Sequence, residues 1–263
     1  MKTIWAKEMK STWISFLIWT IAVGGMGFVC ILLYSSMEDS MQEMADSFAS
    51  MGAFADAFGM STLSIATLTG YFATEIGTIH GLGSGMFAAA MATTMISKEE
   101  AGHSAEFLLA LPVSRGKAVG AKICTIITQI LLFHIICGAS YAGGFLLLGE
   151  EMMMKEFLTF MGLQILMNFE IAGICLLISA GSRENRLGIG MGVALVLYLF
   201  DLMARIVPAL EDYAMVSPYS FANASEIFVG KDMNYSAIGL GIVVIVACVA
   251  GGYTWYRTRD LAS

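Results

Sequence analysis

The chain has 263 residues, of which 57% are hydrophobic and 13% are charged, and its mean hydropathy is +0.75. A soluble domain carries roughly a quarter of its residues as charged side chains, so this composition excludes a water-soluble fold and indicates apolar surface facing lipid. The net charge of −7, without a long run of Lys or Arg, gives no indication of nucleic-acid binding.

The N-terminal segment carries Lys2, Lys7 and Lys10 before an apolar run. That run is too long for a signal peptide and lacks a small-residue cleavage site, so we expect an uncleaved first membrane helix. A hydrocarbon core of about 30 Å requires about 20 helical residues. Six stretches satisfy this requirement: residues 13–34, 76–96, 123–148, 157–179, 187–204 and 237–256. The sequence therefore predicts an all-α polytopic membrane protein in which residues 1–263 form one transmembrane domain.

The distribution of Lys and Arg predicts the orientation. Cytoplasmic loops of membrane proteins are enriched in these residues. With six spans, both termini and the second and fourth loops collect Lys2, Lys7, Lys10, Lys98, Arg115, Lys117, Lys122, Arg183, Arg186, Arg257 and Arg259. The other loops contain only Lys155, Arg205 and Lys231 and are rich in Asp and Glu. Both termini are therefore predicted to be cytoplasmic.

The first outer loop carries a stripe of apolar side chains at alternating spacings of four and three, made of Met37, Met41, Met44, Phe48 and Met51. This spacing is typical of an amphipathic helix, and we predict one that lies on the membrane or on a partner. Thioether ligands also bind Cu(I), but apolar packing is the favoured interpretation and no metal site is predicted. The following residues, 59–74, are interpreted as an interfacial or partly buried lead-in to the second span.

The longest cytoplasmic segment, residues 97–122, joins the second span to the third. Its apolar residues fit one side of a short helix that Pro112 ends. A short amphipathic helix between two spans suits docking onto a soluble partner, and an interfacial helix that rests on lipid explains the same pattern. The pattern alone leaves both interpretations open.

This loop continues after Gly102 to Glu-Phe-Leu-Leu-Ala-Leu-Pro-Val-Ser-Arg at 106–115, and then to Ala121-Lys122 at the next span. Together with the amphipathic opening 2–10 and the ending Tyr-Arg-Thr-Arg-Asp-Leu at 256–261, it resembles the ABC type-2 exporter permeases. The pair His103-Ser104 departs from the Thr-Leu-type pair of that family.

The resemblance implies a permease subunit of an ATP-driven ABC exporter that moves an amphipathic or hydrophobic substrate, such as a peptide, lipid or antibiotic, out of the cell. It further implies a multi-pass protein of the cell (plasma) membrane that pairs with a second permease subunit, as a homodimer or heterodimer. ATP and Mg would be bound by a separate ABC ATP-binding subunit. This chain would then be a transport subunit without enzymatic activity or a cofactor of its own, and it contains no G-x-x-x-x-G-K-[ST] motif. The partner-docking residues implied in the coupling segment are Glu99, Glu100, Gly102, Glu106, Phe107, Leu108, Leu109, Leu111, Pro112 and Arg115.

Polar residues inside the fourth span form a second candidate site. Gln164 and Asn168 are four residues apart and share a helix face, whereas Glu170 lies roughly opposite. An ionised carboxylate in the bilayer is costly and must face the bundle or a cavity. These residues could line the translocation path or the subunit interface; the favoured alternative is that Glu170 bonds a neighbouring helix and fixes packing.

Other polar and small residues are interpreted as structural. Asp201 and Arg205 form an i, i+4 pair near the outer end of the fifth span. His80 and His134 are interpreted as packing histidines. Small-residue spacing predicts close helix packing at Gly77, Gly81 and Gly85, and at Gly188 and Gly192.

Two other functional classes compete with a permease. Glu99-Glu100 resembles the start of an E-E-x-x-x-R intramembrane-protease signature, but the sixth position is Ser104 and no later span supplies paired histidines. No catalytic residues are therefore proposed. A non-transporting membrane immunity or scaffold protein of the same fold stays open.

Overall fold

The computed structural model describes residues 1–102 and 114–258, and the regular structure of these residues is entirely helical. Six segments of this part of the chain are long and apolar enough to cross a membrane: Lys2–Phe48, Leu68–Ala101, Arg115–Leu148, Met154–Gly181, Leu187–Ile206 and Tyr235–Thr258. The predicted all-α, six-span class is confirmed.

The first two spans each contain a short π-helical segment. In the first, Ile21–Gly25 joins α1 (Lys2–Thr20) to α2 (Met26–Ala49). In the second, Phe72–Ile76 joins α4 (Leu68–Tyr71) to α5 (Gly77–Ala101). Such segments shift the backbone register by one residue and recur at functional positions.

The remaining spans are uninterrupted helices, α7 (Arg115–Leu148), α8 (Met154–Gly181), α9 (Leu187–Ile206) and α12 (Tyr235–Thr258). Short helical elements fill the connections: α3 (Ala53–Phe58), α10 (Pro208–Glu211), a 3-10 turn at Ala214–Val216, and α11 (Ala224–Val229).

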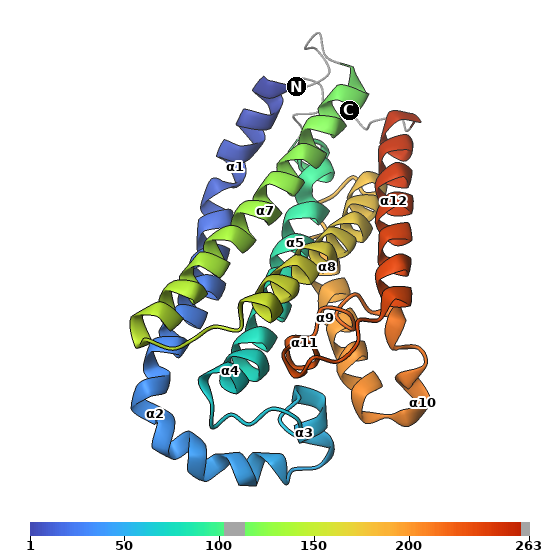
Figure 1. The fold of residues 1–263 in the computed structure, drawn as a ribbon. Coiled ribbons are helices and arrows are strands. Elements are labelled where there is room, and N and C mark those ends of the chain that lie inside the picture. The colour runs from blue at the N-terminus through green and yellow to red at the C-terminus, as the bar shows by residue number, and fades with distance from the viewer. Residues whose placement is uncertain (103–113, 259–263) are drawn as a thin grey trace.

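The central helix of the bundle is α5, which packs against both α8 and α9. The last span, α12, lies along α8, whereas α1 and α2 pack against α7 (Figure 1). The start of α1 and the end of α12 lie at the same end of the bundle, where α5 ends and α7 begins (Figure 1). We call this the terminal end, and the end that carries α3 and α10 the opposite end.

The methionine stripe lies on a helix, as predicted, but this helix is the continuation of the first span. Figure 1 shows the second half of α2 bending across the opposite end of the bundle. Met41 and Phe48 pack toward the interior, whereas Met37 and Met44 are exposed. In the predicted lead-in, Met60 and Ile65 are buried, as expected, but residues 68–74 belong to the second span, which begins at Leu68 and not at residue 76.

Glycines allow the central helix to approach its neighbours. A Cβ atom on Gly77 would lie 2.4 Å from Ala224 Cβ, and one on Gly85 would lie 2.1 Å from the Tyr219 hydroxyl. Close packing is confirmed there. At Gly188 and Gly192, by contrast, nothing lies within 4 Å, so the predicted packing is wrong within the single chain. The intervening Gly190 makes the contact with α5 instead.

A substitution at Gly190 tests this packing. A Cβ atom there would lie 1.8 Å from Thr93 Oγ1 and 3.2 Å from the Ala89 carbonyl oxygen. Gly190→Ala should therefore lower the free energy of unfolding by about 1–3 kcal/mol, as overpacking does. The measurement is thermal unfolding of the purified chain in detergent. Gly192→Ala, on the open side of the same helix, is the control, and equal melting temperatures for the two variants would contradict the packing.

Candidate functional site

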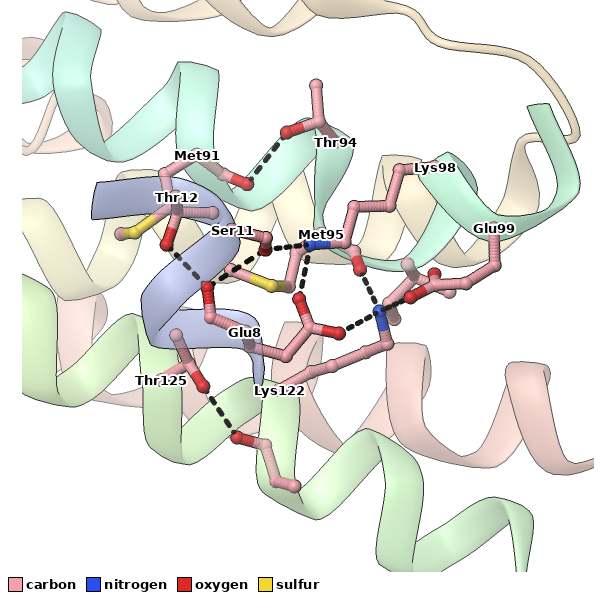
Figure 2. Close-up of polar contacts among 12 residues, drawn as sticks. Glu8, Ser11, Thr12, Met91, Thr94, Met95, Lys98, Glu99, Lys122 and Thr125 are labelled. Atoms are coloured by element: carbon pink, nitrogen blue, oxygen red, sulfur yellow. Dashed lines mark hydrogen bonds and ion pairs between the residues drawn. The ribbon is translucent and has the colours of Figure 1, made fainter. Parts of the chain in front are cut away.

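Four charged side chains from three helices meet at the terminal end (Figure 2). Lys122 of α7 places its Nζ 2.6 Å from Glu99 Oε1 and 3.4 Å from Glu8 Oε1, and it also donates to the Met95 carbonyl. Lys98 donates to the second carboxylate oxygen of Glu8. We call Glu8, Lys98, Glu99 and Lys122 the charge cluster; two carboxylates and two ammonium groups give it no net charge.

Burial makes the charge cluster a strong constraint. The side chains of Glu8 and Lys122 are each 1% exposed, and that of Glu99 is 4% exposed. Removing a charge from water costs several kcal/mol, which close pairing offsets only while all members are present. The cluster therefore specifies how its three helices fit together.

The positions of the four residues along the chain explain what the cluster holds. Lys98 and Glu99 lie in the last turn of α5, and Lys122 lies two turns into α7. The cluster thus joins both ends of the cytoplasmic loop predicted from the sequence, and Glu8 fastens them to the N-terminal helix. Further along the same face, Gln129 of α7 donates to the Thr12 hydroxyl. A movement of this loop would therefore displace α1, α5 and α7 together.

The predicted docking residues are placed unevenly. Glu99 and Glu100 are buried, Gly102 is exposed at the end of α5, and Arg115 is half-buried at the start of α7. Six docking residues lie outside the described residues: Glu106, Phe107, Leu108, Leu109, Leu111 and Pro112. The docking role of this segment stays a prediction.

Sequence reasoning missed the charge cluster because its members lie far apart in the chain. The sequence uses of Lys122, as a charge that determines orientation and as part of the Ala121-Lys122 pair, do not relate it to Glu8. A usable signal was Glu8, the only acidic residue before Glu38, placed between Lys7 and Lys10. An isolated carboxylate in a basic amphipathic helix is a candidate for an ion pair with another helix.

A hydrogen-bonded network lies inside the membrane-spanning part of the bundle. Asn168 of α8 donates through Nδ2 to Ser84 Oγ of α5 at 2.9 Å and lies 3.1 Å from His134 Nε2 of α7. The Nδ1 atom of His134 is 2.9 Å from the Ile130 carbonyl, so the proton belongs on Nδ1 and Nε2 accepts. Gln164 extends the network, because its Oε1 accepts from Ser84 Oγ at 3.4 Å and its Nε2 donates to the Ala222 carbonyl at 2.9 Å.

A second histidine adjoins this network. The ring of His80 lies 5.2 Å, centroid to centroid, from that of His134, and its Nδ1 is 3.0 Å from the Tyr141 hydroxyl. The hydroxyl of Tyr141 lies 3.4 Å from the carbonyl of Val23 in the first π-helical segment. The network therefore connects the first span, α5, α7 and α8 through side chains. Both histidines pack in the core, as predicted.

Glu170 faces the other side of α8. A Cβ atom on Gly241 of α12 would lie 2.5 Å from Glu170 Oε2, so the glycine makes room for the carboxylate. The side chain is buried, and Oε2 has no hydrogen-bond partner within the described chain. Polar groups thus lie on two sides of the fourth span, as predicted. The two roles predicted for Glu170, in transport or in packing, both stay predictions.

The opposite end carries a polar cavity of about 650 Å³ between α3, α9, α10 and α11. Its lining includes the acidic residues Asp56, Asp201, Glu211, Glu226 and Asp232 and the basic residues Arg205 and Lys231. Asp201 forms the predicted i, i+4 ion pair with Arg205, and Lys231 Nζ lies 2.8 Å from Glu226 Oε1. Five carboxylates against two cations leave the lining three charges negative.

The six apolar helices and their buried polar contacts define a multi-pass helical membrane protein. The family described as ABC-2 family transporter protein matches residues 3–261, so the chain belongs to this family of ABC transporter permeases. Members of the family generally work with a separate ATP-binding subunit. No curated protein matches the chain.

Removing one member of the charge cluster should destabilise the bundle. Lys122→Gln leaves two buried carboxylates short of a cation and should lower the free energy of unfolding by about 3–5 kcal/mol. Lys117→Gln, which removes an exposed charge from the same helix, should change it by less than about 0.5 kcal/mol. Urea titration of the purified chain measures both, and similar midpoints would show that the cluster contributes little.

The intramembrane network should contribute less than the charge cluster. Asn168→Leu removes two side-chain hydrogen bonds, and interhelical bonds in membranes contribute about 0.6–2 kcal/mol each. We expect a loss of about 1–3 kcal/mol in thermal unfolding. Met167→Leu, a buried apolar change on the same helix, is the control, and a smaller loss for Asn168→Leu than for this variant would contradict the network.

Proposed function

We propose that this protein is the permease subunit of an ATP-driven exporter in the cell membrane and that it moves an amphipathic or hydrophobic substrate outward. The observation that carries the proposal is the family match over residues 3–261. The charge cluster adds a physical route for coupling. It links α5 and α7, the helices at the two ends of the predicted cytoplasmic loop, to α1.

The proposed orientation places the terminal end in the cytoplasm. Eleven of the fourteen Lys and Arg residues belong to the termini and to the two loops assigned to this side, as the positive-inside rule requires. The cavity with excess carboxylates then opens outside the cell. This arrangement presents the loop between α5 and α7 to a cytoplasmic ATP-binding subunit.

Two partners complete the proposed transporter. A separate ABC ATP-binding subunit binds ATP and Mg and docks on the segment 97–122, and a second permease subunit, identical or homologous, forms the other half of the path. Closure of the ATP-binding subunits would push on the loop. The charge cluster would then carry this displacement into α1, α5 and α7, which pack against one another.

The class of function is tested by affinity purification from native membranes followed by identification of co-purified subunits. An ABC ATP-binding subunit should be recovered, and substrate should stimulate ATP turnover of the reconstituted complex. Recovery of no such subunit would contradict the proposal. A complex whose ATP turnover no substrate stimulates would favour the non-transporting alternative.

The docking segment is tested separately. Glu106→Lys or Leu109→Asp should lower stimulated ATP turnover at least about tenfold, as loss of an interface hot spot of about 2 kcal/mol does, while membrane insertion stays normal. The matched control is Glu184→Lys, an exposed charge reversal in the loop between α8 and α9. Unchanged turnover in the segment variants, or equal losses in the control, would refute the docking assignment.

A further inference from the structure

A basic cavity of about 490 Å³ lies at the terminal end between the start of α7 and the end of α12. Arg115, Lys117 and Arg257 line it, and none of the described residues in its lining is acidic. The charge cluster, only a few residues away along α7, has its two cations matched by two carboxylates. The cavity thus gathers three cationic side chains, of which Arg115 also has a contact within the chain, around a space large enough for a phosphate-bearing group.

The local backbone explains why the two helices form this cavity. Gly116 has no side chain, and a Cβ there would lie 2.6 Å from the Tyr253 hydroxyl, so α12 can approach the first turn of α7. The Arg257 guanidinium lies 5.5 Å from the centroid of the Tyr253 ring, which holds it beside the cavity. The N-terminal end of α7, a helix of 34 residues, adds the positive end of its dipole.

An apolar groove of about 510 Å³ adjoins this cavity between α7, α8 and α12. Side chains of α7, α8 and α12 line it, among them Ile123, Ile127, Leu176, Val249 and Ala250. Tyr253 borders both the cavity and the groove. No charged residue occurs in the described lining of the groove.

The groove reaches to about the depth of one leaflet of a bilayer. Ile123 and Ile127 follow Lys117 by six and ten residues, which is roughly 9–15 Å along a helix. Half of the hydrocarbon core is about 15 Å thick. A molecule with its anionic group among the three cations would therefore place a fatty-acyl chain in the groove.

We infer that the cavity and the groove form one site for an anionic phospholipid, whose phosphate binds among Arg115, Lys117 and Arg257 and whose acyl chain lies between α7 and α12. Basic pockets between membrane helices bind anionic headgroups in this way. The shared border of the groove and the cavity at Tyr253 favours a lipid over free phosphate, which would leave the groove unused.

The test measures lipid retained by the purified full chain in native mass spectrometry, with phosphatidylglycerol compared with phosphatidylcholine of the same acyl chains. Phosphatidylglycerol should be retained preferentially. Affinity should fall about fivefold for each cation removed, because each contributes roughly 1 kcal/mol at a membrane surface. The triple variant Arg115→Gln, Lys117→Gln, Arg257→Gln should thus bind about 100-fold more weakly.

Matched controls distinguish binding at the proposed site from a general effect of net charge. The triple variant Lys155→Gln, Arg183→Gln, Arg186→Gln removes three exposed charges from other positions and should retain phosphatidylglycerol. In the groove, Ala250→Trp fills exposed space and should weaken binding about tenfold by displacing about two methylene groups. Ala247→Trp, exposed on the same helix outside the groove lining, should not.

Three outcomes would overturn the inference: equal retention of the two lipids, equal losses in the two triple variants, or displacement of the lipid by inorganic phosphate with no effect of Ala250→Trp. The last outcome would identify an anion site without an acyl-chain groove. The measurement requires no ATP-binding subunit, so its result is independent of the proposed export function. Size-exclusion profiles of all variants report on folding.

Discussion

A bilayer core offers no water to hydrogen-bond with, so each polar group that enters it must find its partner within the protein. The structure follows this constraint at two levels. Within the bundle, Asn168 bridges Ser84 and His134, which come from two other helices. At the terminal end, Lys122 lies between the carboxylates of Glu8 and Glu99. Apolar packing brings the helices together, and these polar contacts determine their register.

The same constraint explains which features the sequence could predict. Six apolar stretches, and a helix under the methionine stripe, follow from local composition and periodicity. The polar faces of the fourth span follow from the 3.6-residue repeat, which places Glu170 opposite Asn168. Pairing between distant segments does not follow, because nothing local relates Glu8 to Lys122. The packing predicted from small-residue spacing was wrong in α9. Gly190 approaches α5, whereas Gly188 and Gly192 face open space.

The terminal end combines two kinds of electrostatic site within a short length of α7. Three of the four side chains of the charge cluster are buried, and the cluster is internally neutral, which suits a mechanical joint between the predicted cytoplasmic loop and the helices. The basic cavity is wider, and its described lining has no carboxylate, which suits a ligand from outside the chain. Lys122 belongs to the first and Lys117 to the second. Helix α7 would thus respond both to an ATP-binding subunit and to the lipid around it.

The charge cluster also bears on the order in which the protein is made. Glu8 precedes Lys98 by 90 residues and Lys122 by 114 residues. At a synthesis rate of 5–20 residues per second, roughly 6–23 s pass before the second lysine exists. During biogenesis Glu8 therefore has only its sequence neighbours Lys7 and Lys10 as nearby cations until the second and third spans are made. The complete charge cluster can form only after the third span has emerged, so the N-terminal helix is made first and reaches its final contacts late.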